Sequence, residues 1–199
     1  MKLARNSVAL MGAMLLATAC GEKADENAMT DSAALAAGSS AAAMPAPAPA
    51  LTDANIVYIV SMANKGEIER GNIADTKGTN AEVKSYGKMI VGEHTALETE
   101  AQALATRLGV TPMAPASDQS EAMARQQMDI FNSTEKGAAW DKTYVDYELT
   151  YHQGLMETVR TAIAAAQNAE LKALLEKAAP IVQKHIDMAQ ALQQKMATM

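Results

Sequence analysis

Three histidines are the residues of this chain best suited to bind a metal ion, and its 199 residues contain no others. His94, His152 and His185 each fall on an apolar stripe in which apolar residues recur every three and four positions, the spacing of a helix that packs into a core. Neutral imidazole binds zinc, copper, iron and nickel, whereas an unpaired imidazole in a core carries a desolvation cost. The pattern therefore supports two hypotheses, a metal site and a layer of hydrogen-bonded core histidines.

The positions of the histidines along their helices predict that all three lie at one depth. Turns between neighbouring helices are predicted near Gly78 and Asn168, and both turns would lie at the same end of an up-down-up-down bundle. Each histidine stands 16 or 17 residues from its turn, which is roughly 24 Å of helix. We therefore expect the three rings to meet in one layer, within about 8 Å of one another.

Other side chains near this layer extend the set of candidate residues. Met62 reaches the same depth and Glu148 lies one turn from His152, so both are candidate ligands, while Glu98 and Met188 are candidate contacts of the ligands. Thioethers together with imidazoles suit copper, especially Cu(I), although methionine most often fills gaps in helical cores. We expect copper or zinc rather than iron, because the Glu-x-x-His motifs of a ferritin-type di-iron site are absent.

Composition and turn signals predict an all-α domain. Apolar residues make up 49% of the chain and aromatic residues only 4%, and alanine, leucine and methionine, which favour helices, supply most of the apolar content. Four long helices are expected at about 53–75, 79–108, 139–166 and 168–199, with a short helix at about 118–133. Thr79–Glu82 and Asp118–Glu121 have capping-box spacing, and Pro180 is expected to kink or restart the last helix. Short hinges then predict an antiparallel, up-down-up-down four-helix bundle.

The N-terminal third of the chain indicates export and anchoring. Residues 1–19 have the basic start and short apolar stretch of a secretory signal peptide. The motif "LATAC" ends in Cys20, the only cysteine, and resembles a bacterial lipobox, which predicts lipidation and attachment to the outer membrane, facing the periplasm. Ordinary cleavage before Cys20 would instead leave a soluble periplasmic or secreted protein. Residues 20–51, rich in alanine, proline and serine, are expected to tether a domain at 52–199.

Charge and motif content exclude several functions. With Lys2 and Arg5 removed from the 17 basic residues, 15 remain against 23 acidic residues, a net charge near −8. No basic run is present, so binding to nucleic acid is not expected. The sequence contains no phosphate loop, dinucleotide motif or nucleophile–base pairing. We therefore expect the protein not to be an enzyme unless a bound metal supplies the chemistry.

Five stretches between residues 53 and 196 resemble, in order, the motifs of a bacterial envelope family catalogued as domain of unknown function 4142, within the ferritin-like group. They are "NKGEIERGNIA", "MIVGEH" ending in His94, "WDKTYV", the segment around His152, and "PIVQKH" ending in His185. Glu93 stands where aspartate is usual in that family, and Trp140 where phenylalanine is. The resemblance implies a ferritin-like helical bundle in the periplasm or at the outer membrane, with no established activity. It also marks Glu69 as the carboxylate of the first motif, expected to lie near the ligands.

Taken with the histidine layer, these features predict an envelope protein that binds a transition-metal ion, for sequestration or in envelope stress. Two alternatives stay open: a metal-free structural or interaction domain of the envelope, and a ferritin-like metal-dependent oxidase. Imidazole binds a metal only when neutral, so affinity is expected to fall as pH drops through the region near 6.5. The sequence does not identify a protein partner.

Overall fold

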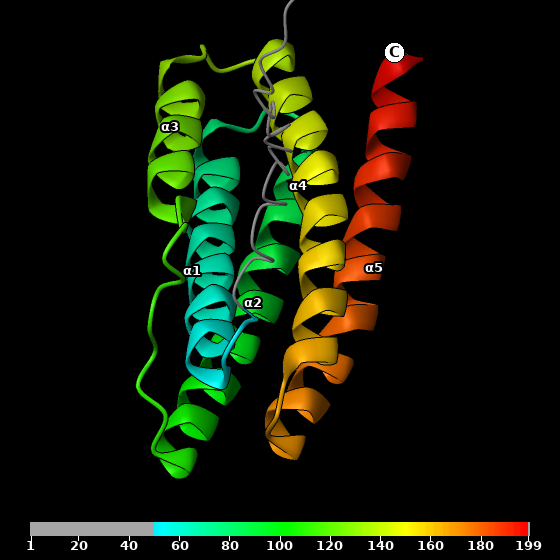
Figure 1. Ribbon diagram of the computed structural model, residues 1–199. Coiled ribbons are helices and arrows are strands. Elements are labelled where there is room, and N and C mark those ends of the chain that lie inside the picture. The colour runs from blue at the N-terminus through cyan, green and yellow to red at the C-terminus, as the bar shows by residue number, and fades with distance from the viewer. Residues whose placement is uncertain (1–49, 199) are drawn as a thin grey trace, which may run out of the picture. The chain divides into compact units, whose positions relative to one another are not determined.

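The computed structural model describes residues 50–198, and within this range the chain is entirely helical and contains no strand. The five helices are α1 (Asp53–Lys77), α2 (Ala81–Leu108), α3 (Ser120–Ser133), α4 (Ala138–Ala165) and α5 (Ala169–Ala197) (Figure 1). None of these five is both long and apolar enough to cross a membrane. The predicted signal peptide, Cys20 and all but the last two residues of the predicted tether lie outside the described residues.

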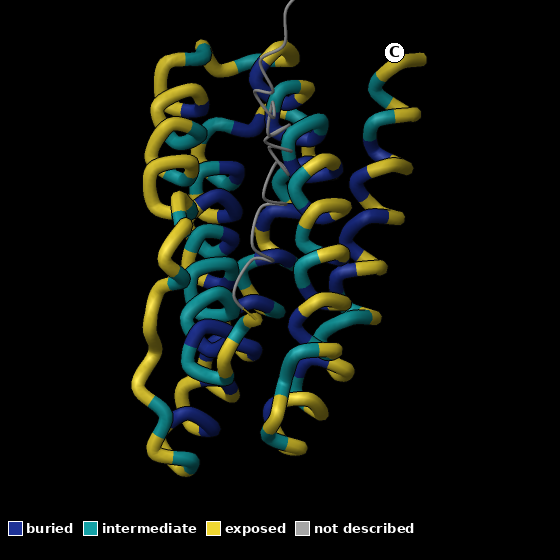
Figure 2. The backbone as a smooth tube through the Cα atoms, viewed as in Figure 1, coloured by how far each residue is buried: buried dark blue, intermediate teal, exposed yellow. Residues whose placement is uncertain are grey.

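The four long helices lie side by side, and the short helix α3 lies on the outside of α1 (Figure 1). α1 packs along α2 and α4 packs along α5, and only three residues connect the two helices of each pair. The buried residues of all four face inward, while α3 is mostly exposed (Figure 2). The predicted all-α class, with four long helices and one short helix, is confirmed.

The predicted up-down-up-down order of the helices is wrong. The turn between α1 and α2 bonds to Asp141 at the start of α4, whereas the turn between α4 and α5 bonds to Asp53 at the start of α1. The two turns therefore lie at opposite ends, and α4 runs parallel to α2 (Figure 1). The reason is the long connection between α2 and α4, which includes α3 and returns the chain to the end where α2 began.

Two hydrophobic clusters fill the core, one towards each end of the long helices. The first contains Tyr86 and Ile90 of α2 together with aromatic residues of α3 and α4. The second contains Leu104 of α2 and Leu171 of α5. Along α2, His94 lies between Ile90 of the first cluster and Leu104 of the second, so the histidine layer lies near the boundary of the two clusters.

An aromatic group holds α3 against the rest of the domain. The ring of Trp140 stacks on that of Tyr144, with centroids 5.3 Å apart, and Trp140 donates its indole N–H to the backbone carbonyl of Phe131. Phe131 is the one residue of α3 that is buried. Lys77, at the end of α1, donates to three carbonyls at the C-terminal end of α3, including that of Phe131. α3 is therefore attached through one buried side chain and a few backbone acceptors.

The start of α2 differs from the predicted capping box. Asn80, rather than Thr79, caps the helix, and its side chain accepts from the backbone N–H groups of Glu82 and Val83. Thr79 is unavailable because its backbone and hydroxyl both donate to the buried carboxylate of Asp141, which also accepts from the N–H of Asn80. Asp141 thus ties the turn between α1 and α2 to the first turn of α4. The sequence showed the local cap but not this distant competitor.

The box predicted at the start of α3 does not form either. Gln119 occupies the N-cap position without a side-chain bond, because Asp118 accepts from the backbone and hydroxyl of Ser120 instead. By contrast, Asn168 caps α5 as predicted, accepting from the N–H groups of Glu170 and Leu171.

α5 is one continuous helix with Pro180 inside it, so the predicted restart does not occur. Pro180 is exposed, and its missing N–H leaves one carbonyl of the preceding turn without its helical partner. The apolar stripe predicted for α5, in which Leu174, Ile181 and Met188 stand with His185, is buried only in part. Leu175, Val182 and Ala189 are buried, whereas Met188 is 37% exposed.

Candidate metal centre

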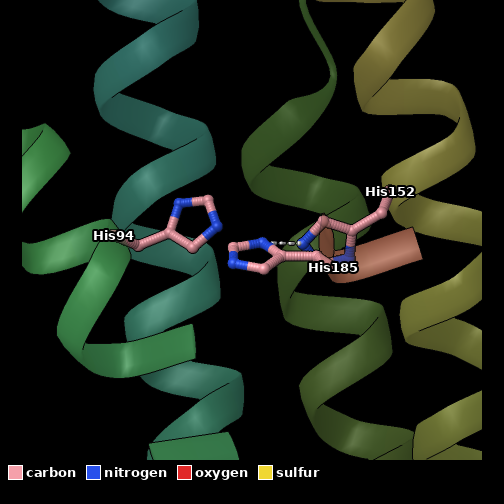
Figure 3. Close-up of side chains that lie close together, drawn as sticks. All are labelled: His94, His152 and His185. Atoms are coloured by element: carbon pink, nitrogen blue, oxygen red, sulfur yellow. Dashed lines mark hydrogen bonds between the residues drawn. The ribbon is translucent and has the colours of Figure 1, made fainter. Parts of the chain in front are cut away.

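The three histidine rings meet in the middle of the core. His94, His152 and His185 come from α2, α4 and α5, and none is more than 1% exposed. Their ring centroids lie 6.0, 5.2 and 4.9 Å apart (Figure 3). One nitrogen of each ring lies within 4.8 Å of a nitrogen of both others. The predicted single layer of rings is confirmed, but the premise that both turns lie at one end is wrong. The rings meet because each histidine stands near the middle of its helix, at the same depth from either end.

Burial keeps the imidazoles neutral at neutral pH. Desolvation lowers the pKa of His94 to about 2 and that of His185 to about 4, and repulsion from neighbouring imidazolium ions acts in the same direction. Desolvation also lowers the pKa of His152. Each ring therefore carries one N–H and one lone pair, and the hydrogen bonds decide which nitrogen is which.

The tautomer of His152 follows from a backbone carbonyl. Its Nδ1 lies 2.9 Å from the carbonyl oxygen of Glu148, four residues earlier in α4. A carbonyl oxygen can only accept, so Nδ1 carries the hydrogen and Nε2 carries the lone pair. That Nε2 points towards His185.

A chain of polar residues fixes His94 in the same way. The carboxylate of Glu98 accepts from Nδ2 of Asn64, at 3.3 Å, which determines how the amide of Asn64 is oriented. The oxygen Oδ1 of Asn64 then faces Nδ1 of His94 at 2.9 Å and accepts its hydrogen. Nε2 of His94 therefore carries the lone pair. Within residues 50–198 this buried nitrogen has no hydrogen-bond partner.

His185 is held by a carboxylate near the surface. Its Nε2 lies 2.8 Å from Oε2 of Glu93, which also pairs with Lys184. Partial burial would raise the pKa of Glu93, but the hydrogen bonds from Lys184 and His185 outweigh it and lower that pKa. Glu93 is therefore an ionised acceptor, and Nε2 of His185 carries the hydrogen. Nδ1 of His185 is left with its lone pair, 3.1 Å from the lone pair of His152 Nε2.

The three assignments leave three lone pairs directed into one small space. Each ring is fixed on its outer nitrogen by an acceptor: Asn64 for His94, the Glu148 carbonyl for His152, and Glu93 for His185. Metal-binding histidines are held in this manner, with the second N–H given to a carbonyl or carboxylate. Two facing lone pairs repel each other, and a cation placed between them removes that repulsion. The donor set fits an ion that prefers nitrogen ligands.

A buried group of charges adjoins the histidines. Glu67 of α1 and Glu148 of α4 are both fully buried, and Arg70 lies between them, with Nε 2.8 Å from Glu148 and a terminal nitrogen 2.7 Å from Glu67. Oε1 of Glu67 lies 3.4 Å from Nε2 of His152. Burial raises the pKa of Glu67, and burial with the neighbouring Glu67 charge raises the pKa of Glu148 to about 7.

Arg70 also closes the side of the core between α1 and α4. Its guanidinium carbon lies 4.0 Å from the ring centroid of Tyr151 and 5.3 Å from that of Tyr147. Arg70 itself is only 3% exposed. A cation stacked on two aromatic rings therefore covers this approach to the histidines.

The remaining predicted residues divide into those beside the site and those away from it. Glu148 is fully buried beside His152, and Glu98 contacts His94 through Asn64. Glu69, in contrast, lies on the exposed face of α1.

Two predicted methionines also lie away from the rings. Met62 is half-buried, and the α1 residues that lie against the histidines are Asn64 and Glu67. Met188 is partly exposed, because the buried face of α5 is turned away from it.

Sequence reasoning missed Asn64, Glu67 and the orienting role of Glu93. Residues two apart on a helix point roughly 200° apart, so when Glu67 faces the core Glu69 faces solvent. A signal for the correct face was present in α1. Asn64, Glu67, Gly71 and Ala74, spaced by three and four, are all buried. That stripe escaped notice because half of its residues are polar.

Comparison with known proteins gives a family but no function. The model of a family described as Domain of unknown function (DUF4142) matches residues 38–192, which is more than half of the chain and includes all three histidines. No curated protein matches the chain, and no solved structure does. The chain therefore belongs to the family described as Domain of unknown function (DUF4142).

Proposed function

We propose that this protein binds one transition-metal ion through Nε2 of His94, Nε2 of His152 and Nδ1 of His185. The observation that carries the proposal is the set of three unprotonated nitrogens that face one another, each on a ring fixed by an acceptor at its other nitrogen. A purely structural histidine layer would use these lone pairs to accept hydrogen bonds. Nε2 of His94 accepts none from any residue between 50 and 198.

Copper and zinc are the ions that suit these ligands best. Three imidazoles satisfy Cu(I), whereas Zn²⁺ takes a fourth ligand in a tetrahedral arrangement. Glu67 supports the zinc option, because its buried Oε1 lies 3.4 Å from His152 Nε2. The carboxylates of Glu67 and Glu148, set against the single charge of Arg70, also provide negative charge that offsets a bound cation.

The setting of the site supports storage or sequestration of the ion rather than catalysis. All three rings are almost completely buried, so a bound ion would offer little room for a substrate. In this proposal the bundle is ferritin-like, which the single long connection between α2 and α4 favours, because ferritin-like bundles have one long crossover. A lipid on Cys20 would hold the domain at the outer membrane, facing the periplasm.

A ferritin-like oxidase is the second candidate, because one observation favours it. Glu67, Glu148 and His152 form another group whose ligand atoms lie within 4.8 Å of one another. Carboxylates with a histidine are the ligands of di-iron sites. Oxidation of Fe(II) by oxygen no faster than in buffer would exclude this candidate.

Thermal unfolding of chelator-stripped protein tests the metal proposal. An ion that binds only the folded state, at a hundredfold excess over its dissociation constant, stabilises the protein by about 2.7 kcal/mol. The parent should therefore melt at a higher temperature with Zn²⁺ or Cu⁺, and His152→Leu should lose most of that gain. Leu104→Ala, a core change away from the histidines, should lower the melting temperature with and without metal and retain the gain. Absence of any metal-dependent gain in the parent would establish the metal-free alternative.

A further inference from the structure

The burial of the histidines raises the question of how an ion reaches them. Two of the three acceptors that orient the rings are inaccessible: Asn64 is 3% exposed, and the Glu148 carbonyl lies inside α4. The side between α1 and α4 is covered by Arg70, which is 3% exposed, stacks on Tyr151 and pairs with Glu148. Glu93 is different, since its side chain is 30% exposed while it touches His185.

Glu93 lies in a depression of about 310 Å³ on the surface between α2 and α5. Two ion pairs frame it, Glu93 with Lys184 and Glu100 with Lys177. Its remaining lining is apolar, and it includes Leu97 of α2 and Pro180 of α5. Carboxylates at the edge of the depression provide oxygen ligands through which a hydrated cation can exchange its first waters.

Leu97 separates this depression from a small cavity inside the core. The cavity has a volume of about 40 Å³ and is lined by His94, Asn64, Leu97 and aliphatic side chains. Leu97 thus contributes to the wall of both spaces and is 6% exposed. A close-packed core resists displacement of a side chain, but the cavity gives Leu97 room to move inward. Behind it lies the ring of His94.

A second surface depression, of about 440 Å³, lies farther along the same two helices. It shares Leu174 with the inner cavity, and Leu104 and Glu170 line it. None of its lining residues hydrogen bonds to a histidine of the site, within the part of the chain that the structure describes. It therefore provides a matched control for the first depression.

We propose that metal ions enter and leave the histidine site through the depression at Glu93, with Leu97 as the gate and Glu93 as the first protein ligand. This inference rests on the proposed metal-binding function. Pro180, which removes one helical hydrogen bond of α5 beside the depression, lowers the resistance of that helix to opening. The ion passes from the Glu93 carboxylate to Nδ1 of His185 as the gate side chain moves into the cavity.

The test measures uptake and release rates together with affinity, using Zn²⁺ or Cu⁺, whichever gives the larger melting shift in the parent. A gate changes only the free-energy barrier to entry and exit of the ion. Leu97→Ala should therefore raise both rates about tenfold and leave the dissociation constant within about threefold of the parent's. Leu104→Ala, a substitution of the same residue type at a similarly buried position of α2, should change neither rate. Uptake by Leu97→Ala at the parent's rate, or faster uptake by Leu104→Ala alone, would overturn the route.

A surface variant keeps the test independent of core packing. Glu93→Gln retains an oxygen that accepts from His185 but loses the charge, so uptake should slow about tenfold. If Glu93 only positioned His185, the retained acceptor would leave the uptake rate unchanged, and that result would contradict its role as first ligand. Glu170→Gln, in the second depression, should load like the parent. If the parent binds no ion, the proposed function is refuted. If the parent binds an ion and all four variants take it up at the parent's rate, only the route is refuted.

Discussion

Replacement of Arg70 by methionine isolates the charge that sits between two buried carboxylates. Methionine retains an unbranched apolar side chain, so the main loss is the guanidinium that contacts Glu67 and Glu148. Removing one partner of a buried ion pair typically costs about 3–5 kcal/mol, because the other charge is left uncompensated. In this protein the carboxyls of Glu67 and Glu148 can take up protons instead, so the loss of folding stability should depend on pH.

The sign follows from the raised pKa values. Glu148 titrates at about 7 in the folded parent and near 4.5 when unfolded, so its contribution to stability is present below 4.5 and is lost as pH rises towards 7. Without Arg70 its folded pKa rises further, and each additional pH unit above 7 costs about 1.4 kcal/mol relative to the parent. We expect Arg70→Met to lose about 1–2 kcal/mol at pH 5 and about 3–5 kcal/mol at pH 8.

Urea unfolding of the chelator-treated protein at the two pH values measures this difference. Arg107→Met is the matched control, because Arg107 forms an exposed pair with Glu170 and should lose less than about 1 kcal/mol at either pH. An equal loss at pH 5 and pH 8 for Arg70→Met would show that the buried carboxyls do not take up the protons, and the reasoning would fail.

The other predictions concern pH, one turn and the N-terminus. Folded pKa values of about 4 for His185 and about 2 for His94 lie below the usual 6.5, so the unfolded chain binds protons first. Each of these two histidines therefore lowers the free energy of unfolding by about 1.4 kcal/mol per pH unit below 6.5, and Glu148 offsets part of this loss. A metal-free protein that melts at a higher temperature at pH 4.5 than at pH 6.5 would contradict this prediction. Because the folded histidines stay neutral below pH 6.5, the protein should still bind metal at about pH 5.5, where a free imidazole would be mostly protonated. Asp141→Asn should cost about 1–3 kcal/mol in urea unfolding, since an amide cannot accept all three bonds of the α1–α2 turn. Mass spectrometry of the mature N-terminus should find a lipid on Cys20; an unmodified thiol there would rule out the anchor.

The sequence was most informative where a helix has one clear apolar face. The stripe of α2 placed His94 correctly. The count from the turns gave the correct shared depth from a wrong helix order, because histidines near the middle of their helices meet whichever way the helices run. In α5, apolar residues are adjacent in the pairs Leu174–Leu175 and Ile181–Val182, so two neighbouring faces fit the pattern equally well. Packing against α4 and α2 decides between them, and that choice is not local.

The orienting contacts were less accessible to sequence reasoning, for a different reason. Asn64 and Glu67 are polar residues on a buried face, and helical periodicity of apolar residues does not detect them. Asp141 competes for Thr79 from 62 residues away. Such pairings depend on how helices are placed against one another, whereas the stripe of each helix depends on that helix alone.

The stacked indole of Trp140 gives the protein a built-in optical signal. The chain has one tryptophan, so all indole fluorescence comes from a single buried place, where the ring meets Tyr144 and its N–H meets the carbonyl of Phe131. Phe131 belongs to α3, the helix with one buried residue. Detachment of α3 would expose the indole and shift its emission to longer wavelength while the four long helices keep their circular dichroism. Comparison of the two signals during unfolding would thus separate local opening at this end from loss of the whole domain.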